Sequence, residues 1–191
     1  YGESTIVLPA LNGLRTAAPG TRLAVLETAP SRIAKLAEQG EIDLAFHTRE
    51  GAPPGLRQRT LFSERYVLVG RVGHPKLHEN LTLTQFCQLE QVMVSPDGGG
   101  FYGITDQALA DVGLTRRVVL SVPHFLFVIS VLTQSDLVAM LPERLVRTQP
   151  LLQQLEPPLA VPGFEMTMLW HERSHRDPAH RWLREHIVRS V

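Results

Sequence analysis

Apolar residues along the first third of the chain recur at spacings that predict helices and strands in alternation. Val7, Leu11, Leu14 and Ala18 follow helical spacing, so we predict a helix here that Pro19-Gly20 ends. Beyond it, the pattern predicts a strand at 22–27, a helix that begins at Pro30-Ser31 and ends at Gly40, and a buried strand at 42–46. A strand, a helix and a second strand in this order are typical of a parallel sheet covered by helices.

A second series of alternating elements follows a long apolar run. Leu56–Gly70 predicts one extended strand, which His74-Pro75 ends. The later segments predict helices at 83–89, 102–112, 124–132, 142–146 and 178–191, and strands at 91–94, 117–121, 137–141, 155–160 and 164–170. The pattern therefore predicts two similar α/β halves.

These halves indicate a fold of the α/β class with two Rossmann-like lobes. We place lobe I at 1–71 and 163–191 and lobe II at 72–162, with the break near Arg71, because the last strand and helix can return to the first half. Such a chain crosses between its lobes twice. Ligands of open α/β sheets bind at the carboxyl ends of the strands, so we expect the ligand site in the cleft between the lobes.

The first residues form a loop and a helix where a doubly wound lobe normally opens with a strand. The loop Gly2–Thr5 feeds the first helix directly. We therefore expect the opening strand, and further sequence, upstream of Tyr1.

Composition and charge narrow the classes of protein to which this chain can belong. Apolar residues make up 43% and charged residues 20% of the chain, which is ordinary for a globular domain. Lys plus Arg and Asp plus Glu number 19 each, whereas a domain that wraps nucleic acid by itself is usually basic, so we do not expect this part to contact DNA. The single cysteine, Cys87, excludes a disulfide within the chain and favours a reducing compartment. With no signal segment and no membrane-spanning run, we expect a soluble, cytoplasmic protein without membrane contact.

Motifs that would indicate catalysis or metal binding are missing from the sequence. The chain has no Gly-x-Ser-x-Gly motif, and Cys87 has apolar neighbours, as expected in a core. His171, His175 and His180 do not have the spacing of zinc ligands. The segment Asp97–Gly100, a candidate mobile lip, lacks the Lys-Ser/Thr of a phosphate-binding loop. We therefore predict no enzyme activity, no metal and no cofactor.

Several motifs, taken in their order and spacing, resemble the effector-binding domain of LysR-type transcriptional regulators. Gln39–Phe46 (QGEIDLAF) resembles the turn into the second strand, which is among the most recognisable stretches of that family. Leu61–Val69 followed by Gly73-His74-Pro75 is similar to its lobe-crossing strand. Gln134–Pro142 resembles its G-x-G-x-x-x-L-P segment, although polar residues at 134–136 stand where many members carry glycine. The resemblance covers essentially the whole chain.

That departure, together with Val122–Phe125 and Trp170–Pro178, is typical of one branch of the family. It is the branch of nodulation and aromatic-degradation regulators, typified by the naphthalene/salicylate and nitrotoluene regulators. The resemblance implies a periplasmic-binding-protein type 2 architecture. It also implies a winged helix-turn-helix, absent from this chain, as the only part that contacts DNA. Finally, it implies a small organic effector, with aromatic compounds as candidates, and assembly into a homodimer or tetramer.

Candidate effector-binding residues of the first lobe lie where loops meet helices or strands end. Ser4 and Thr5 lie at a helix N-terminus, where free N–H groups and hydroxyls suit an anion; Ser4 as a helix cap is the alternative. Thr28 lies between the second predicted strand and its helix, where the alternative is that Thr28 or Ser31 only caps that helix. His47 follows a buried strand, a position at which a surface residue is the more common case.

Two further candidates, Glu64 and Trp170, lie on the predicted crossing strands. The resembling branch contacts its ligand with a polar residue at the position of Glu64, and a carboxylate there favours an effector that is neutral, cationic or presents a hydroxyl. The alternative is a solvated charge beside Arg65. Trp170 is predicted as a pocket wall near the hinge, or else as an aromatic in a core face.

His124 is the leading candidate in the second lobe, because it opens an apolar helix directly after Pro123. An imidazole at a helix start can donate or accept toward a ligand, and the helix N-terminus favours its neutral form. In the resembling branch this Pro-His-Phe meets the effector across the cleft, so Phe125 is included. Ser95, which follows a predicted strand, completes the set. The alternative is a capping or packed histidine.

Three classes of function follow from these features. The first is an allosteric sensor within a dimeric or tetrameric transcription factor, whose effector shifts it between arrangements. The second is a free-standing solute-binding protein of the same architecture, and the third is an enzyme, for which no constellation of residues is present. An upstream helix-turn-helix would favour the first class, and a signal peptide the second.

Overall fold

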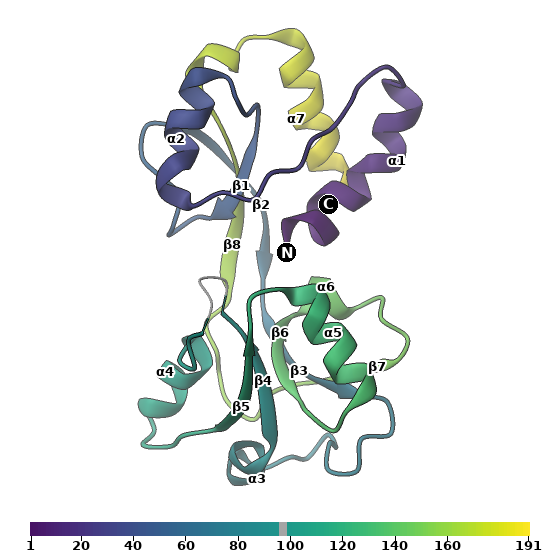
Figure 1. The fold of residues 1–191 in the computed structure, drawn as a ribbon, viewed down its shortest axis with the longest axis vertical. Helices are drawn as coiled ribbons and strands as arrows, with labels where there is room; N and C mark the ends of the chain where they lie inside the picture. The colour runs from purple at the N-terminus through teal and green to yellow at the C-terminus, as the bar shows by residue number, and fades with distance from the viewer. Residues whose placement is uncertain (96–98) are drawn as a thin grey trace. The chain divides into compact units, whose positions relative to one another are not determined.

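The computed structural model describes residues 1–95 and 99–191, which form two compact units (Figure 1). Unit 1 consists of Tyr1–Glu64 and Phe164–Val191, and unit 2 of Arg65–Gly163. The chain thus passes between the units after residues 64 and 163, whereas we expected the breaks after residues 71 and 162. Among the described residues, no helix has the length and apolar character needed to cross a bilayer.

Unit 1 is built on a three-stranded sheet with β8 (Phe164–Trp170) at its centre. β8 pairs antiparallel with β1 (Ala45–Thr48) on one side and with β2 (Arg57–Glu64) on the other. In the register with β2, Glu64 lies opposite Phe164 and Arg57 opposite Trp170. The two ends of β8 therefore meet different parts of β2, about 20 Å apart along the strand.

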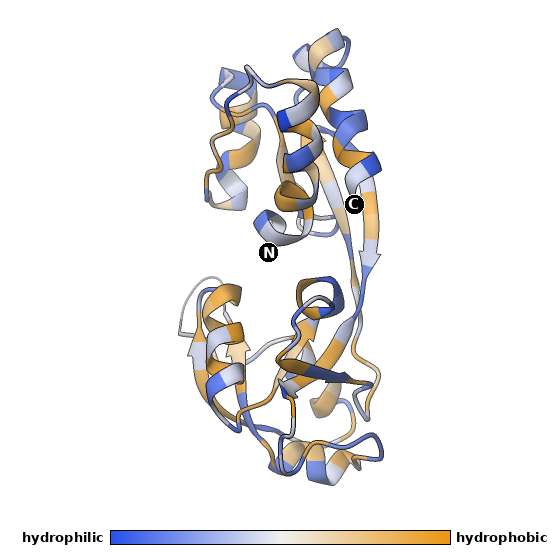
Figure 2. Ribbon diagram, turned by 90° about the vertical axis from the view of Figure 1, so that its right-hand side faces the viewer, coloured by the Kyte–Doolittle hydropathy of each residue, from blue (hydrophilic) through white to orange (hydrophobic). Residues whose placement is uncertain are grey.

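Helices pack against this sheet and bury its apolar side chains. The helical elements of unit 1 are η1 (Glu3–Val7), α1 (Leu8–Ala17), α2 (Pro30–Gln39), η2 (Glu172–Ser174) and α7 (Pro178–Ser190). The helices of unit 1 carry alternating hydrophilic and hydrophobic bands (Figure 2), as expected of helices with one buried face. The core joins Ile6 of η1, Met168 and Trp170 of β8, and Ile187 of α7.

The strand predicted at 22–27 is not formed. This segment joins α1 to α2 without regular structure (Figure 1), and Leu23, Val25 and Leu26 are exposed. No described strand pairs with it, and an apolar segment becomes a strand only where a neighbour supplies backbone partners. The prediction of a parallel sheet in this half is therefore wrong. The sheet of unit 1 is antiparallel, because the returning β8 lies between β1 and β2.

The described residues of unit 2 form two sheets, which one isolated bridge links. Its strands are β3 (Tyr66–Arg71), β4 (Glu90–Val94), β5 (Arg117–Val122), β6 (Ala139–Pro142) and β7 (Leu152–Leu155), and its helices are α3 (Leu83–Gln88), α4 (Ile104–Ala110), α5 (Phe125–Gln134) and α6 (Glu143–Val146). β3 pairs antiparallel with β6 and β7, whereas β4 and β5 pair in parallel. Gln91 of β4 forms a parallel bridge with Val138, next to β6. Phe86 and Leu109, from α3 and α4, lie in the core.

Two predicted strands differ from the structure for identifiable reasons. The run predicted as one strand over Leu56–Gly70 is two strands, because β2 pairs with β8 of unit 1 whereas β3 pairs with β6 and β7 of unit 2. The strand predicted at 155–160 lies instead at Leu152–Leu155. Pro157 and Pro158 follow it, and proline supplies no N–H to a ladder.

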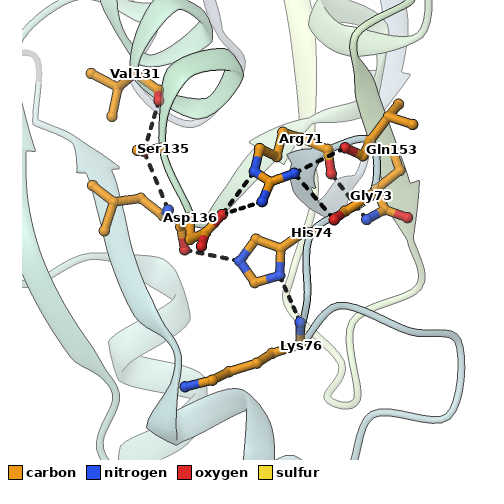
Figure 3. A network of polar contacts seen from close by, with 10 residues as sticks. Arg71, Gly73, His74, Lys76, Val131, Ser135, Asp136 and Gln153 are labelled. Carbon is orange, nitrogen blue, oxygen red and sulfur yellow. Dashed lines mark hydrogen bonds and ion pairs between the residues drawn. The ribbon is translucent and has the colours of Figure 1, made fainter.

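The polar residues that stand where the resembling family carries glycine belong to a hydrogen-bond network of unit 2 (Figure 3). Ser135 Oγ donates to the carbonyl oxygen of Val131 at 2.8 Å, at the end of α5. The Asp136 carboxylate pairs with Arg71 at 2.7 Å, and the Asp136 carbonyl accepts a hydrogen bond from His74 Nε2 at 2.9 Å. The network joins the turn after α5 to the end of β3, which gives these residues a structural role.

Candidate functional site

One cluster of predicted site residues lies in unit 1, at the start of η1 and the end of β2. The Tyr1 hydroxyl donates a hydrogen bond to the Glu64 carboxylate, and Glu64 is only 5% exposed. The Tyr1 ring packs edge-on against Phe164, with the ring centroids 5.7 Å apart. Glu64 is therefore buried against a phenol, and the alternative of a solvated charge beside Arg65 is wrong.

Ser4 and Thr5 lie inside the first turn of η1 and not before it. Their backbone N–H groups both donate to the Tyr1 carbonyl oxygen, at 3.1 and 3.2 Å, and Thr5 Oγ1 donates to the same oxygen at 3.1 Å. Gly2 is the N-cap, and no side chain caps this helix. The expectation of free N–H groups for an anion is therefore wrong at these two residues, and so is the alternative that Ser4 caps the helix.

Thr28 carries a polar atom that the fold leaves without a partner. Its Oγ1 is buried, and it is the one buried side-chain nitrogen or oxygen in the described part of the chain that forms no hydrogen bond. Ala29 is the N-cap of α2, and no side chain caps that helix, so neither Thr28 nor Ser31 has the capping role that was the alternative. Native structures rarely leave a buried hydroxyl unpaired, because its lost hydration costs free energy.

Thr28 also lies close to the cluster around Tyr1. The carboxylate of its neighbour Glu27 is close enough to the backbone nitrogen of Tyr1 to act on it electrostatically. The end of the segment that joins α1 to α2 is thus near the start of η1.

Two further candidates of unit 1 lie on β1 and β8. His47 on β1 packs its ring against Gly51, with Nδ1 3.1 Å from the Thr48 carbonyl oxygen, in the turn that follows the strand. Trp170 ends β8, and Glu64 pairs with the opposite end of that strand, about 20 Å away. This position fits the alternative of an aromatic in a core face, since Trp170 is buried in the core of unit 1. The Arg184 guanidinium packs over the indole, and the His175 ring stacks with it.

A second cluster lies in unit 2, at the carboxyl ends of the parallel strands β4 and β5. Ser95 follows β4, and its backbone N–H donates to the carbonyl oxygen of Val122, the last residue of β5, at 2.8 Å. His124 and Phe125 come two and three residues later in the chain and begin α5. In open α/β sheets this edge is where ligands bind.

His124 is exposed and is the N-cap of α5, yet its imidazole makes no capping hydrogen bond. The capping and packed alternatives for its side chain are therefore both wrong. At the end of β5, Ser121 Oγ donates to the Gly100 carbonyl oxygen and so ties the segment after β4 to β5. Asp97 and Gly98 of the predicted mobile lip lie outside the described residues.

Tyr1 is the residue of these clusters that the sequence did not indicate. A tyrosine in a loop does not by itself predict a particular contact, and only the fold brings the Tyr1 hydroxyl to a glutamate 63 positions away. Among the described residues, no group of three or more His, Cys, Asp or Glu side chains is arranged to hold a metal ion. His180 is engaged in the core, where Nε2 lies 2.9 Å from the Asp43 carbonyl oxygen and Nδ1 contacts Arg184.

Comparison with known proteins gives one consistent match. A family model described as LysR substrate binding domain matches residues 2–191. The HTH-type transcriptional regulator SyrM 1 of Sinorhizobium fredii is 35% identical over 154 residues, which are 79% of this chain and 46% of that protein. The HTH-type transcriptional activator NagR of Ralstonia sp is 33% identical over 190 residues, which are 98% of this chain and 63% of that protein. The chain thus spans about half to just under two thirds of these curated relatives.

A solved structure shares the fold over the whole chain. The regulatory domain of MexT, a transcriptional activator in Pseudomonas aeruginosa, has a TM-score of 0.83 and 28% identity, and the match covers 100% of this chain and 95% of that one. Together with the family match, this likeness confirms the predicted α/β class and the two-lobed, periplasmic-binding-protein type 2 architecture.

Proposed function

The chain belongs to the LysR substrate binding domain family, and on that premise we propose that it senses a small organic effector for a transcriptional regulator without catalysing a reaction. Its relatives SyrM 1 and NagR are a transcriptional regulator and a transcriptional activator, and they are longer than this chain. We propose that the whole protein binds DNA through a helix-turn-helix domain, assembles as a homodimer or tetramer and acts in the cytoplasm.

The observation that carries the site in unit 1 is the unpaired hydroxyl of Thr28. A ligand that accepts from or donates to this hydroxyl removes the cost of its burial, so binding is favoured there. Thr5 and Tyr1 lie in the same part of the unit, and the Tyr1 phenol is already bonded to Glu64. We propose that Thr28, Thr5 and Glu64 contact the effector, with Ser4 at their margin.

Glu64 sets the chemical class of effector. A buried carboxylate disfavours an anionic group beside it, whereas a hydroxyl of the effector could share the acceptor oxygens that Tyr1 uses. We therefore propose a neutral aromatic molecule that carries a hydroxyl, rather than an aromatic carboxylate.

In unit 2, we propose His124, Phe125 and Ser95 as effector contacts. His124 is exposed, its imidazole caps nothing, and it lies where the first-turn N–H groups of α5 begin. Ser95 lies on the neighbouring strand end. His47, which follows Phe46 on β1 beside Gly2, stays a proposed contact, whereas Trp170, at the opposite end of β8 from Glu64, has no part in this proposal.

A screen of defined probes tests the proposal. Phenol, 2-naphthol, naringenin, benzoate and salicylate are titrated against the purified chain by thermal shift and calorimetry. The hydroxyl-bearing neutral probes are expected to stabilise the chain more than the carboxylates do. A preference for benzoate over all neutral probes would contradict the assigned role of Glu64.

Thr28→Val gives a sharper test, because it removes the hydroxyl and keeps the shape. The apo melting temperature should stay equal or rise, while affinity for the best probe falls roughly 2- to 10-fold, as for one lost hydrogen bond. Thr115→Val, at an exposed position, is the matched control and should leave both unchanged. Equal affinity in Thr28→Val and the wild type would remove Thr28 from the site.

His124→Ala, compared with His78→Ala at another exposed position, tests unit 2 in the same way. The first variant should lose the stabilisation by the best probe at an unchanged apo melting temperature, and the second should behave as the wild type.

DNA binding is tested with the full-length protein, which should retard DNA from upstream of its own gene. Failure to retard any such fragment would count against DNA-binding regulation and favour a free solute-binding role.

A further inference from the structure

Unit 1 has a basic depression far from Glu64, which we name the arginine pocket. It has a volume of about 560 Å³. Five of the side chains that line it are guanidinium groups, those of Arg57, Arg59, Arg176, Arg181 and Arg184. A volume of this size is typical of small-molecule sites.

Elements that are distant in sequence, β2 on one side and β8, η2 and α7 on the other, build the arginine pocket. Arg57 and Arg59 are two positions apart on β2, so their side chains leave the same face of the sheet. Arg57 lies opposite Trp170 of β8, whose indole also lines the pocket. Arg181 and Arg184 come from α7. The fold therefore gathers positive charge that is spread over 128 positions of the sequence.

Carboxylates neutralise only part of this charge. Glu172 pairs with Arg57, and Glu185 pairs with Arg181 at 3.0 Å. Both glutamates line the pocket as well. Among the described residues, no carboxylate forms an ion pair with Arg59, Arg176 or Arg184. Three guanidinium charges thus remain without a carboxylate partner in one depression.

Arg184 is the unusual member, because it is a buried arginine at 6% exposure. Its Nη1 donates to the Ser174 carbonyl oxygen at 3.1 Å, and Nη2 donates to that of His175 at 2.8 Å. Its guanidinium carbon lies 4.6 Å from the centroid of the Trp170 ring. These carbonyl oxygens, the aromatic ring and His180 Nδ1, which Nη1 also contacts, orient the group but carry no negative charge.

The cost of burying this charge is reflected in the pKa of Arg184. Burial lowers the pKa of Arg184, and the charge of Arg181 acts in the same direction, against the carboxylates of Glu185 and Asp177. These carboxylates form no ion pair with Arg184 and do not outweigh the cost of its burial, so an external anion at this place has a favourable effect on stability.

We propose that the arginine pocket is a second binding site, specific for the phosphate group of a small molecule. Guanidinium groups bind phosphate oxygens through two parallel hydrogen bonds, and a phosphate dianion offsets more of the three unpaired charges than a carboxylate does. The depression is larger than a phosphate ion, which leaves room for an organic part. The site is independent of the effector residues, since Trp170 and Glu64 lie at opposite ends of β8.

Calorimetry with the 191-residue chain tests this site, using inorganic phosphate and phenyl phosphate as probes at constant ionic strength. The lining variant is Arg59→Gln/Arg176→Gln, which changes two exposed side chains and so should fold. The control is Arg22→Gln/Arg32→Gln, which removes the same charge from two exposed positions of unit 1 outside the pocket. Circular dichroism establishes folding of both.

The wild type and the control should bind phosphate saturably with the same affinity, and the lining variant about tenfold or more weakly. Tighter binding of phenyl phosphate than of inorganic phosphate would identify an organic monoester as the ligand class, and equal binding would identify free phosphate. The proposal is overturned if the wild type shows no saturable binding of either probe. Equal losses in the lining variant and the control would also overturn it, because they would indicate attraction by net charge alone.

Discussion

Arg116 and Asp106 form a two-point ion pair inside unit 2. Arg116 Nε donates to Asp106 Oδ1 at 2.8 Å and Nη2 to Oδ2 at 2.7 Å, and the two side chains are 3% and 13% exposed. Arg116 also donates to Gln91 Oε1 at 3.0 Å, and Asp106 accepts from the Gly103 N–H, which caps α4. The pair therefore ties α4 to the beginnings of β4 and β5, at the opposite end of these parallel strands from Ser95 and His124.

Loss of one member of this pair should destabilise the protein strongly. Arg116→Met leaves the Asp106 charge buried without its partner, which costs about 3–5 kcal/mol of unfolding free energy in comparable cases. Urea unfolding followed by circular dichroism measures this value.

The adjacent residue provides the control for that experiment. Arg117 pairs with Glu90 at 2.9 Å, but the side chains are 65% and 48% exposed, so Arg117→Met should cost no more than about 1 kcal/mol. Similar losses in the two variants would mean that burial does not set the strength of the Arg116 pair.

Glu143 should make the stability of unit 2 depend on pH in the acid range. Hydrogen bonds from Arg65, at 2.9 and 2.5 Å, lower the pKa of the Glu143 carboxyl, and this effect outweighs the opposite effect of burial. A carboxyl whose pKa is lower in the folded state stabilises that state above its unfolded pKa, and this contribution disappears as the pH falls through the folded pKa.

Glu143→Gln should therefore be less stable than the wild type at neutral pH, by no more than about 1 kcal/mol because the pair is partly exposed. The difference should shrink as the pH falls toward the folded pKa, as measured by urea unfolding across an acid series. Glu79→Gln, at an exposed position, should follow the wild type throughout. A difference that grows in acid would contradict the assignment.

Cys87 should react slowly with thiol reagents. Burial against the core of unit 2 raises the pKa of its thiol, so less of the reactive thiolate is present at neutral pH. The rate with 5,5′-dithiobis(2-nitrobenzoate) should be below that of free cysteine at neutral pH, and its midpoint on a pH series should lie above that of free cysteine. A faster rate than that of free cysteine would show an activated thiol.

Helix and strand patterns with several apolar positions were predicted close to where they form. α5, α7, β4 and β5 lie within a few residues of their predicted bounds, because each buries one continuous set of side chains within one unit. The segment 22–27 has an equally apolar pattern but forms no strand, since a strand depends on a neighbour for its hydrogen bonds. The run 56–70 could not be divided from sequence, because the break after Glu64 is set by which strands pair on either side.

The candidate site residues also divide into features that local sequence predicts and features that depend on distant neighbours. Position after a strand or before a helix marked Thr28, Ser95 and His124, and such positions depend on local sequence. Whether Thr28 is bonded, and which residue meets Glu64, depended on neighbours that only folding brings near. The sequence left Trp170 open between a pocket wall and an aromatic in a core face, and the antiparallel register, which puts it at the opposite end of β8 from Glu64, could not be predicted.

The sequence by itself determined the α/β class, the family and most of the regular elements, because these follow from side-chain periodicity and from motifs of adjacent residues. The tertiary structure alone decided the antiparallel order of β1, β8 and β2, the burial of Glu64 against Tyr1 and the collection of five arginines in one pocket. Each of these depends on pairs of residues far apart in the chain. Their distances are fixed by strand register and packing, which no local pattern encodes.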